Sequence, residues 1–149
     1  MSRPVCAPLP VMRERINRYH IRRKYNMQIE IYATGESIHG SKGKIERMVR
    51  RVLDEEDRKL KTVNIIVADD GYLRDLNRDF LNQDRSTNVI SFDLDDVAEI
   101  YVSRDHADSE YDLYYYIIHG LLHLLGYDHR NAREEKVMHE KCVKYLRNE

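Results

Sequence analysis

The sequence predicts an α+β domain in which a mixed sheet of about four strands is covered by helices. Three observations lead to this prediction: short runs rich in β-branched residues, helical periodicity between and after these runs, and one nearly all-apolar helix that carries histidines. The chain has 149 residues, a length that suits a single domain with a substantial core. The order of the strands does not follow from the pattern.

Each predicted strand is a short apolar run that ends at a turn signal. The first starts at Met27 and stops before Gly35, and residues 62–68 form a β-branched second strand that leads into a helix. Residues 88–94 and 97–103 are two further strands. Only two aspartates separate them, so we expect a hairpin.

Helical signals separate and follow these strands. Apolar side chains within residues 45–53 recur at the spacing of one helix face, and a second helix is expected to run to about Phe80. Residues 111–125 are apolar nearly all the way round, which predicts an interior helix. Asn131, with Glu134 three residues later, resembles a capping box and predicts the start of the last helix. The apolar positions of that helix include Val137, Met138 and Leu146.

The formal net charge of -1 hides an uneven distribution. Residues 1–26 hold seven Lys or Arg and one Glu, so this basic N-terminal extension carries +6, whereas residues 27–149 hold 18 basic and 25 acidic residues and carry -7. The extension is either loosely docked chain, the favoured interpretation, or an arm that contacts RNA. The acidic domain, residues 27–149, argues against indiscriminate nucleic-acid binding, because nonspecific affinity for phosphates comes from Lys and Arg.

One predicted helix also has a charged face that permits two interpretations. Either it faces solvent, the favoured one, or it meets a phosphate backbone. The basic residues of this face are Lys44, Arg47, Arg50 and Arg51.

Composition excludes several classes of protein. With 42% hydrophobic and 34% charged residues the chain is not of a disordered or fibrous type. No segment approaches the roughly 20 apolar residues that span a bilayer, and the N-terminus lacks the apolar core of a secretory signal, so we expect a cytoplasmic protein without a membrane partner. Cys6 and Cys142 are far apart and are expected to be reduced thiols, Cys142 partly buried.

Three histidines in the apolar helix and just beyond it predict a metal site. His119 and His123 stand at i and i+4 and therefore share one helix face. Gly126 can end the helix in the left-handed conformation, which would bring His129 toward the pair. Three protein ligands that leave one position open are typical of catalytic zinc. Core histidines without an ion are the alternative, but a shared cation supplies the partners that buried imidazoles need.

The chemistry of the predicted site depends on what accompanies the histidines. The spacing H-x-x-x-H-x-x-G-x-x-H is also that of metzincin peptidases, which makes the expected fold zincin-like, but their general base follows the first His. Here that position is Gly120, so hydrolysis of a phosphodiester is favoured over hydrolysis of a peptide bond. Asp128 either orients an imidazole or caps a turn. One zinc ion is expected, and other divalent metals are alternatives.

The motif His-Gly-Leu-Leu-His-Leu-Leu-Gly-Tyr-Asp-His at 119–129 resembles the signature of the YbeY endoribonucleases. Leu76-Asn77, the run 84–92 and Glu99-Ile-Tyr-Val-Ser103 are similar to further parts of that family, and the likeness spans residues 27–147. The resemblance implies a zinc-dependent, single-strand-specific endoribonuclease in ribosomal RNA maturation, notably at the 3′ end of the small-subunit RNA, and in ribosome quality control. It implies as partners single-stranded or ribosomal RNA and the small ribosomal subunit or its assembly factors, with no DNA.

One departure from the resemblance affects the catalytic assignment. The family places an Arg after the aromatic residue of its second motif, whereas here Leu81 follows Phe80. Arg85 or Arg78 is the expected substitute, because a guanidinium pairs bidentately with phosphate oxygens, although both can be ordinary surface charges. Further residues expected to orient substrate are Thr87, Asn88 and Ser91. The histidines expected to be incidental are His20, His39, His106 and His139.

Two other functions stay open at this point. A noncatalytic ribosome-associated factor with a structural metal is compatible with Leu81. A metallopeptidase is the weakest alternative, because Gly120 stands where its general base would be.

Overall fold

The computed structural model describes residues 27–34, 38–85 and 87–147, and it confirms the α+β fold with a four-stranded mixed sheet. The strands are β1 (Gln28–Ala33), β2 (Thr62–Ala68), β3 (Val89–Leu94) and β4 (Val97–Ser103). The helices are α2 (Lys42–Glu55), α3 (Asp70–Leu81), α4 (Glu110–Leu124) and α5 (Ala132–Arg147). The basic extension expected at 1–26, with Cys6 and His20, lies outside the described residues.

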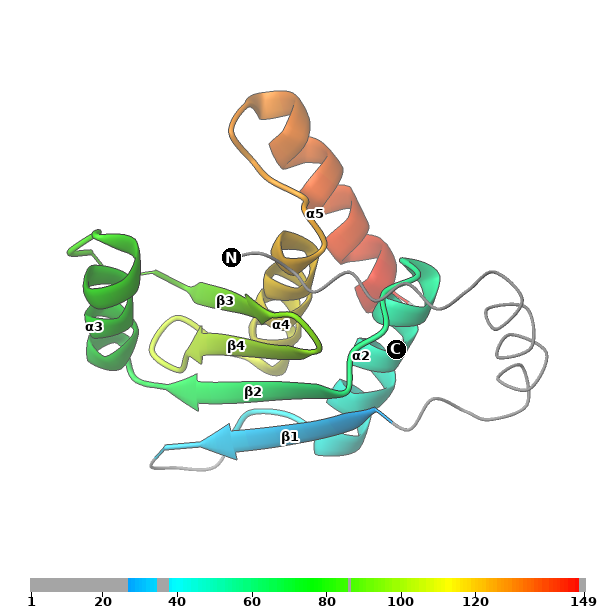
Figure 1. The fold of residues 1–149 in the computed structure, drawn as a ribbon, viewed down its shortest axis with the longest axis horizontal. Helices are drawn as coiled ribbons and strands as arrows, with labels where there is room; N and C mark the ends of the chain where they lie inside the picture. The colour runs from blue at the N-terminus through cyan, green and yellow to red at the C-terminus, as the bar shows by residue number, and fades with distance from the viewer. Residues whose placement is uncertain (1–26, 35–37, 86, 148–149) are drawn as a thin grey trace, which may run out of the picture.

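The strands follow the order β1-β2-β4-β3 (Figure 1). β1 pairs with β2, and β2 with β4, in parallel, while β3 is antiparallel to β4. The expected hairpin is present: Leu94 pairs with Val97, and Asp95 takes a φ of 69° in the intervening turn, a conformation that Asp tolerates better than most residues.

The main core lies on one face of the sheet, where α2 and α4 pack and α5 completes the layer (Figure 1). Alternate residues of the two central strands point into this core, as a period of two requires. The buried residues on that face are Val63, Ile65, Val67, Ala98, Ile100 and Val102. α3 covers part of the other face over a smaller cluster around Leu73 and Ile90.

The helices begin at residues whose side chains are typical N-caps. Ser41, Asp69 and Ser109 accept hydrogen bonds from backbone N–H groups in the first turns of α2, α3 and α4. At α5, Asn131 Oδ1 accepts from Glu134 N at 2.9 Å, which confirms the predicted start. The Glu134 carboxylate accepts from Arg130 N at 3.0 Å, so the second half of the box is displaced by one residue.

One apolar position of the last helix is exposed, and one expectation about this helix is wrong. Val137 is 44% exposed, because α5 packs through a narrow stripe made of Met138, Cys142 and Tyr145. Cys142 is fully buried rather than partly buried. Burial of its thiol raises the pKa to about 12, which keeps it protonated and unreactive at neutral pH.

The basic face of α2 is divided: Lys44 and Arg47 are exposed, whereas Arg50 and Arg51 bond to backbone carbonyls. Arg50 donates to the carbonyl of Met27 at 2.7 Å, and Arg51 donates to the carbonyl of Tyr145. These bonds tie the helix to the start of β1 and to α5. Among the described residues, no helix has both the length and the apolar character needed to cross a membrane.

Candidate metal centre

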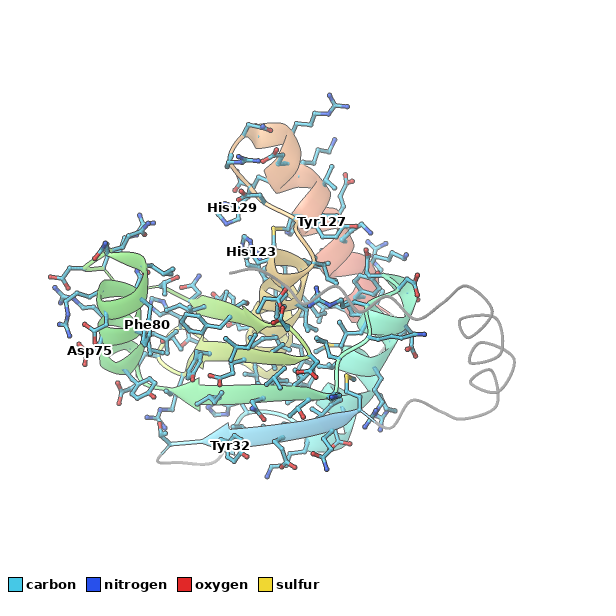
Figure 2. All side chains as sticks on the ribbon, in the orientation of Figure 1. Tyr32, Asp75, Phe80, His123, Tyr127 and His129 are labelled. Atoms are coloured by element: carbon cyan, nitrogen blue, oxygen red, sulfur yellow. The ribbon has the colours of Figure 1, made fainter. Side chains whose placement is uncertain are left out.

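Three imidazoles meet at the C-terminal end of α4, where the sequence predicts a metal site. Nitrogens of His119, His123 and His129 lie within 4.8 Å of one another. The Nε2 atoms of His119 and His123 are 3.0 Å apart, close to the roughly 3.3 Å expected for two zinc–nitrogen bonds of about 2.0 Å at a tetrahedral angle. His119 and His123 are half-buried and His129 is exposed, so the cluster is open on one side. Figure 2 labels two of the three, His123 and His129, which lie near each other.

A Schellman turn at the end of α4 brings the third histidine to the other two. Gly126 adopts a φ of 97°, its N–H bonds to the His123 carbonyl at 3.0 Å, and the Tyr127 N–H bonds to the Leu122 carbonyl at 3.0 Å. A residue with a side chain is strained at that φ, which accounts for glycine here. The chain reverses at this turn, and His129 follows it.

The ring of His123 is held in the tautomer that a metal ligand needs. Its Nδ1 lies 3.1 Å from the backbone carbonyl of Tyr127. A carbonyl only accepts hydrogen bonds, so Nδ1 carries the proton and the lone pair of Nε2 faces the cluster. The donor set and its orientation therefore fit a zinc ion.

Both helical histidines are neutral at neutral pH. Burial lowers the pKa of His119 to about 4, with further lowering from His123 and His129. Burial and the proximity of His129 also lower the pKa of His123, and together they outweigh the opposite effects of the Tyr127 carbonyl and Asp128. Since metals bind the neutral imidazole, the site is prepared for a cation without loss of protons from these two rings.

Gly120 faces the β-hairpin rather than the open side of the cluster. A Cβ at this position would lie 2.8 Å from Ile100 Cγ2 and 2.9 Å from both Ser91 Oγ and Val89 Cγ2. The Ser91 hydroxyl donates to the Gly120 carbonyl at 2.7 Å and holds the helix against β3. A glutamate here would collide with the sheet, so α4 as packed cannot carry the general base of a metzincin.

The turn that leads to His129 is braced by the carboxylate of Glu56, the residue that caps the C-terminal end of α2. Tyr127 donates its hydroxyl to Glu56 at 2.8 Å, and Lys141 and Tyr145 of α5 each donate to the same carboxylate at 2.6 Å. Burial raises the pKa of Glu56, but these three hydrogen bonds outweigh it and lower the pKa. Tyr127 and Glu56 are 71 positions apart in the chain. Tyr127 belongs to the histidine motif at 119–129, but nothing in the sequence indicated Glu56 as its partner.

Asp128 makes the contacts of a turn cap. Its carboxylate accepts from the His129 N–H at 2.8 Å and pairs with Arg130 at 3.1 Å. The group that accepts a hydrogen bond from an imidazole is the Tyr127 carbonyl, which lies 3.1 Å from His123 Nδ1. A backbone carbonyl has no sequence signature, so the pattern could not indicate this contact.

The two arginines considered as substitutes at Leu81 differ in their surroundings. Arg78 pairs with Asp79 at 3.1 Å and with Asp75 at 3.2 Å on the exposed side of α3. Arg85 is exposed and makes no side-chain ion pair within the described part of the chain. Its loop is held by the buried Asn77, whose amide donates to the Arg85 carbonyl at 3.0 Å.

The residues expected to orient substrate lie at the start of β3. Thr87 donates to the Val89 carbonyl at 3.3 Å, Asn88 is exposed, and Ser91 is already bonded to α4. Two histidines expected to be incidental have partners: His106 contacts Asp70 at 2.9 Å and His139 contacts Tyr115 at 2.8 Å.

Comparison with known proteins gives one consistent result. A family model described as Endoribonuclease YbeY matches residues 28–148. Proteins named Endoribonuclease YbeY include one from Thermotoga maritima, 35% identical over 118 residues that cover 70% of this chain and 75% of that protein. Another, from Fusobacterium nucleatum, is 30% identical over 142 residues that cover 79% and 83%. The solution structure of TM1509 from Thermotoga maritima matches with a TM-score of 0.53 at 32% identity, covering 80% of this chain and 87% of that one.

Proposed function

Since the chain belongs to the YbeY family of endoribonucleases, we propose that it cleaves single-stranded RNA with one zinc ion held by His119, His123 and His129. The observation that carries the proposal is the convergence of three imidazoles with one side open. A structural zinc site normally has four protein ligands, whereas three ligands leave a position for chemistry.

In this proposal each residue of the site has a defined task. His119 and His123 present neutral nitrogens from a rigid, buried helix, and the Tyr127 carbonyl keeps the His123 lone pair directed at the ion. When bound, zinc supplies Lewis acidity that activates water and offsets negative charge on the phosphate. Arg85 is the better candidate to contact that phosphate, because two aspartates already neutralise Arg78.

The proposed substrate is ribosomal RNA, processed at the 3′ end of the small-subunit RNA, with a further part in ribosome quality control. The small ribosomal subunit or its assembly factors would then be the partners, in the cytoplasm. The family relationship supports RNA as the substrate class, and the net charge of -7 over residues 27–149 fits a protein that acts on a restricted site rather than along any nucleic acid.

The test combines elemental analysis with cleavage of an unstructured RNA and of a small-subunit precursor extended at its 3′ end. The wild type is expected to hold about one zinc per chain and to cleave both RNAs, and EDTA should stop the reaction until zinc is restored. His123→Ala is expected to lose metal and turnover together. His106→Ala is the control, because His106 pairs with Asp70 and lies outside the cluster.

A second candidate, a noncatalytic ribosome-associated factor with a structural metal, is supported by the exposed Leu81 where the family has an arginine. Full zinc content without turnover on either RNA would favour it over the enzyme. Casein degradation that is lost in His123→Ala would instead point to a peptidase.

A further inference from the structure

We propose that the hollow between α4 and α5 is the binding site for the nucleotide next to the scissile phosphate, with Tyr115 and His139 holding its base and Lys136 its phosphate. This inference rests on the proposed function and adds a substrate subsite to it.

The position of the hollow connects it to the metal centre. It has a volume of about 510 Å³, within the range of roughly 300–1,000 Å³ typical of ligand pockets. Two candidate metal ligands, His119 and His129, form part of its wall. The remaining lining residues are Tyr115, Ala132, Glu135, Lys136, Met138 and His139. A phosphodiester that reached the ion from this side would therefore leave its neighbouring nucleotide in the hollow.

The wall of the hollow offers a surface suited to a base. Tyr115 lies one helical turn before His119, and their rings are stacked at a centroid distance of 6.1 Å with 25° between planes. The ring of His139 is 5.8 Å from that of Tyr115 and tilted by 47°. Unpaired bases of single-stranded RNA are held by aromatic and apolar side chains of this kind, whereas a base inside a duplex is not accessible to them.

Polar groups in the hollow can read the edge of a base. Tyr115 Oη and His139 Nδ1 are 2.8 Å apart, which fixes the imidazole and leaves its Nε2 for a ligand. Glu135 adds a carboxylate acceptor to the same wall. Lys136 is only weakly engaged, with its Nζ 3.9 Å from Glu140 and its side chain 77% exposed, so it can turn to a phosphate.

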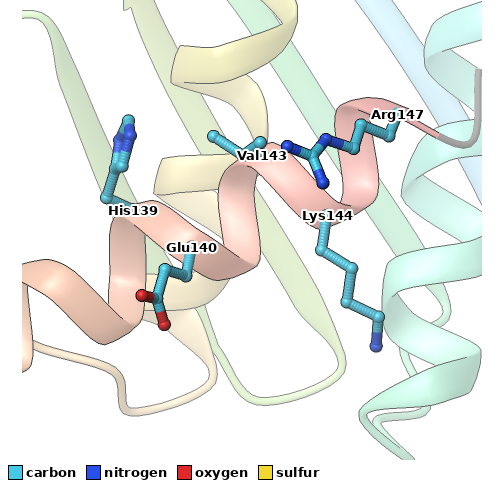
Figure 3. A pocket seen from close by; sticks show the side chains of 5 residues that line it. All are labelled: His139, Glu140, Val143, Lys144 and Arg147. Atoms are coloured by element: carbon cyan, nitrogen blue, oxygen red, sulfur yellow. The ribbon is translucent and has the colours of Figure 1, made fainter.

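The surface continues along α5 beyond His139. This residue also lines a second hollow, of about 440 Å³, together with Glu140, Val143, Lys144 and Arg147 (Figure 3). These residues recur at the spacing of one face of a helix, so the two hollows follow each other along α5. The strand is thus expected to leave the first hollow along a face that carries Arg147, whereas Lys144 already pairs with Glu55 at 3.3 Å.

Steady-state cleavage of short single-stranded RNAs tests the proposal. The intact RNA is compared with two copies that lack one base, on the 5′ or on the 3′ side of the scissile bond. For the wild type, one of the two abasic RNAs should show KM about tenfold higher than the intact RNA, as loss of one stacked base implies. His139→Leu should raise KM for the intact RNA about tenfold, change kcat less than twofold, and no longer distinguish that abasic RNA. Lys136→Ala should raise KM for all three.

The matched control is Arg133→Ala. Arg133, like Lys136, is an exposed cation of α5. It lies in the first turn of the helix and lines a different hollow with Gly126 and Asn131. Its KM values and zinc content should equal those of the wild type. Equal KM for all three RNAs in the wild type, or unchanged KM in His139→Leu and Lys136→Ala, would overturn the subsite while leaving the nuclease intact.

If the wild type cleaved no RNA, the proposed function would fail, and the subsite would be judged by binding. Fluorescence anisotropy with a labelled 2′-O-methyl oligonucleotide, added to the zinc-loaded protein, then gives Kd directly. A rise of about tenfold in His139→Leu but not in Arg133→Ala would support the subsite, and equal Kd values in all variants would exclude it.

Discussion

At the scale of single residues, the environment of His119 determines its protonation state. It thereby determines whether the ring can bind a metal and how the ring affects the stability of the fold. The ring lies on a buried helix beside two other imidazoles, and its Nδ1 atom has no hydrogen-bond partner in the described part of the chain. A protonated ring would be both desolvated and repelled there. The neutral form is therefore the one that the folded protein holds.

This environment predicts how the stability of the metal-free protein depends on pH. Burial lowers the pKa of His119 to about 4 in the folded state, against about 6.5 in the unfolded chain. The unfolded chain then binds more protons between these values, so stability is fully present above pH 6.5 and falls as the pH drops toward 4. We expect a loss of up to about 3 kcal/mol at one such group, measured by urea unfolding in EDTA.

His119→Gln provides the comparison for this measurement, because it retains a polar side chain that does not titrate. Its metal-free form should lose the part of the pH dependence between 6.5 and 4 that comes from His119, while His123, whose pKa is also lowered, should keep its own part. Equal slopes for the variant and the wild type would show that His119 is not the group responsible. Glu56, whose pKa is lowered from 4.5, adds a further loss of stability once the pH falls to about 4.5, at the acidic end of this window.

At the scale of elements, α4 is positioned by close contact with the hairpin and by the turn that follows it. Gly120 allows the helix backbone to approach β3 and β4, and Tyr127 connects the turn to Glu56 of the α2 end. The contact at Gly120 sets how closely α4 packs against the sheet. The bond between Tyr127 and Glu56 sets the path of the chain from His123 to His129.

Gly120→Ala tests the close approach. The added Cβ would lie 2.8 Å from Ile100 and 2.9 Å from Val89 in β-strands that cannot easily yield, so we expect a destabilisation of about 1–3 kcal/mol by urea unfolding. Gly43→Ala is the control, since its Cβ would meet nothing nearer than 3.5 Å in an exposed part of α2. That variant should be neutral or slightly more stable, because alanine favours a helix. Equal destabilisation of both would contradict the packing argument.

Tyr127→Phe tests the brace on the turn. Loss of the hydroxyl removes the 2.8 Å bond to Glu56 and loosens the carbonyl that orients His123, so zinc affinity should fall about tenfold in a chelator competition. Tyr145→Phe also removes a hydrogen bond to Glu56, but Tyr145 lies on α5 outside the turn. It should keep the zinc affinity of the wild type. If zinc affinity fell equally in both variants, the hydrogen bonds to Glu56 would affect zinc binding only through the stability of the fold, and not through the position of the turn.

At the scale of the whole molecule, the core and the metal centre are separate. The main cluster of buried side chains extends over β1, β2, β4 and all but one of the described helices, and the three histidines stand at its margin. The chain can therefore bury its apolar surface without an ion. A small zinc finger differs, because there the metal takes the place of a core.

Metal removal should accordingly weaken the fold without abolishing it. We expect EDTA to lower the free energy of unfolding by about 3 kcal/mol at zinc concentrations near 100 times Kd, while the far-UV circular dichroism stays that of the folded protein. His123→Ala should show little response to either zinc or EDTA. Complete unfolding of the wild type in EDTA would show that the ion is part of the core.

The fold was predictable where a local pattern reports directly on structure. Residues 62–68 form β2 as expected, because a run rich in β-branched residues between the polar Lys61 and Asp69 strongly favours a strand over a helix. The exposure of Val137 could not be predicted, because periodicity alone does not show how wide the contact face of a helix is. The parallel pairing of β1 with β2, across a helix, also lay beyond local patterns.

The sequence by itself determined which three histidines meet, since helical spacing and a left-handed glycine are local properties of the backbone. Tertiary structure alone decided that Glu56 braces Tyr127, that Gly120 faces the hairpin, and that Tyr115 and His139 share a hollow with the metal centre. The reason is physical: these contacts join elements that are distant in the chain, and they exist only once the apolar faces have packed.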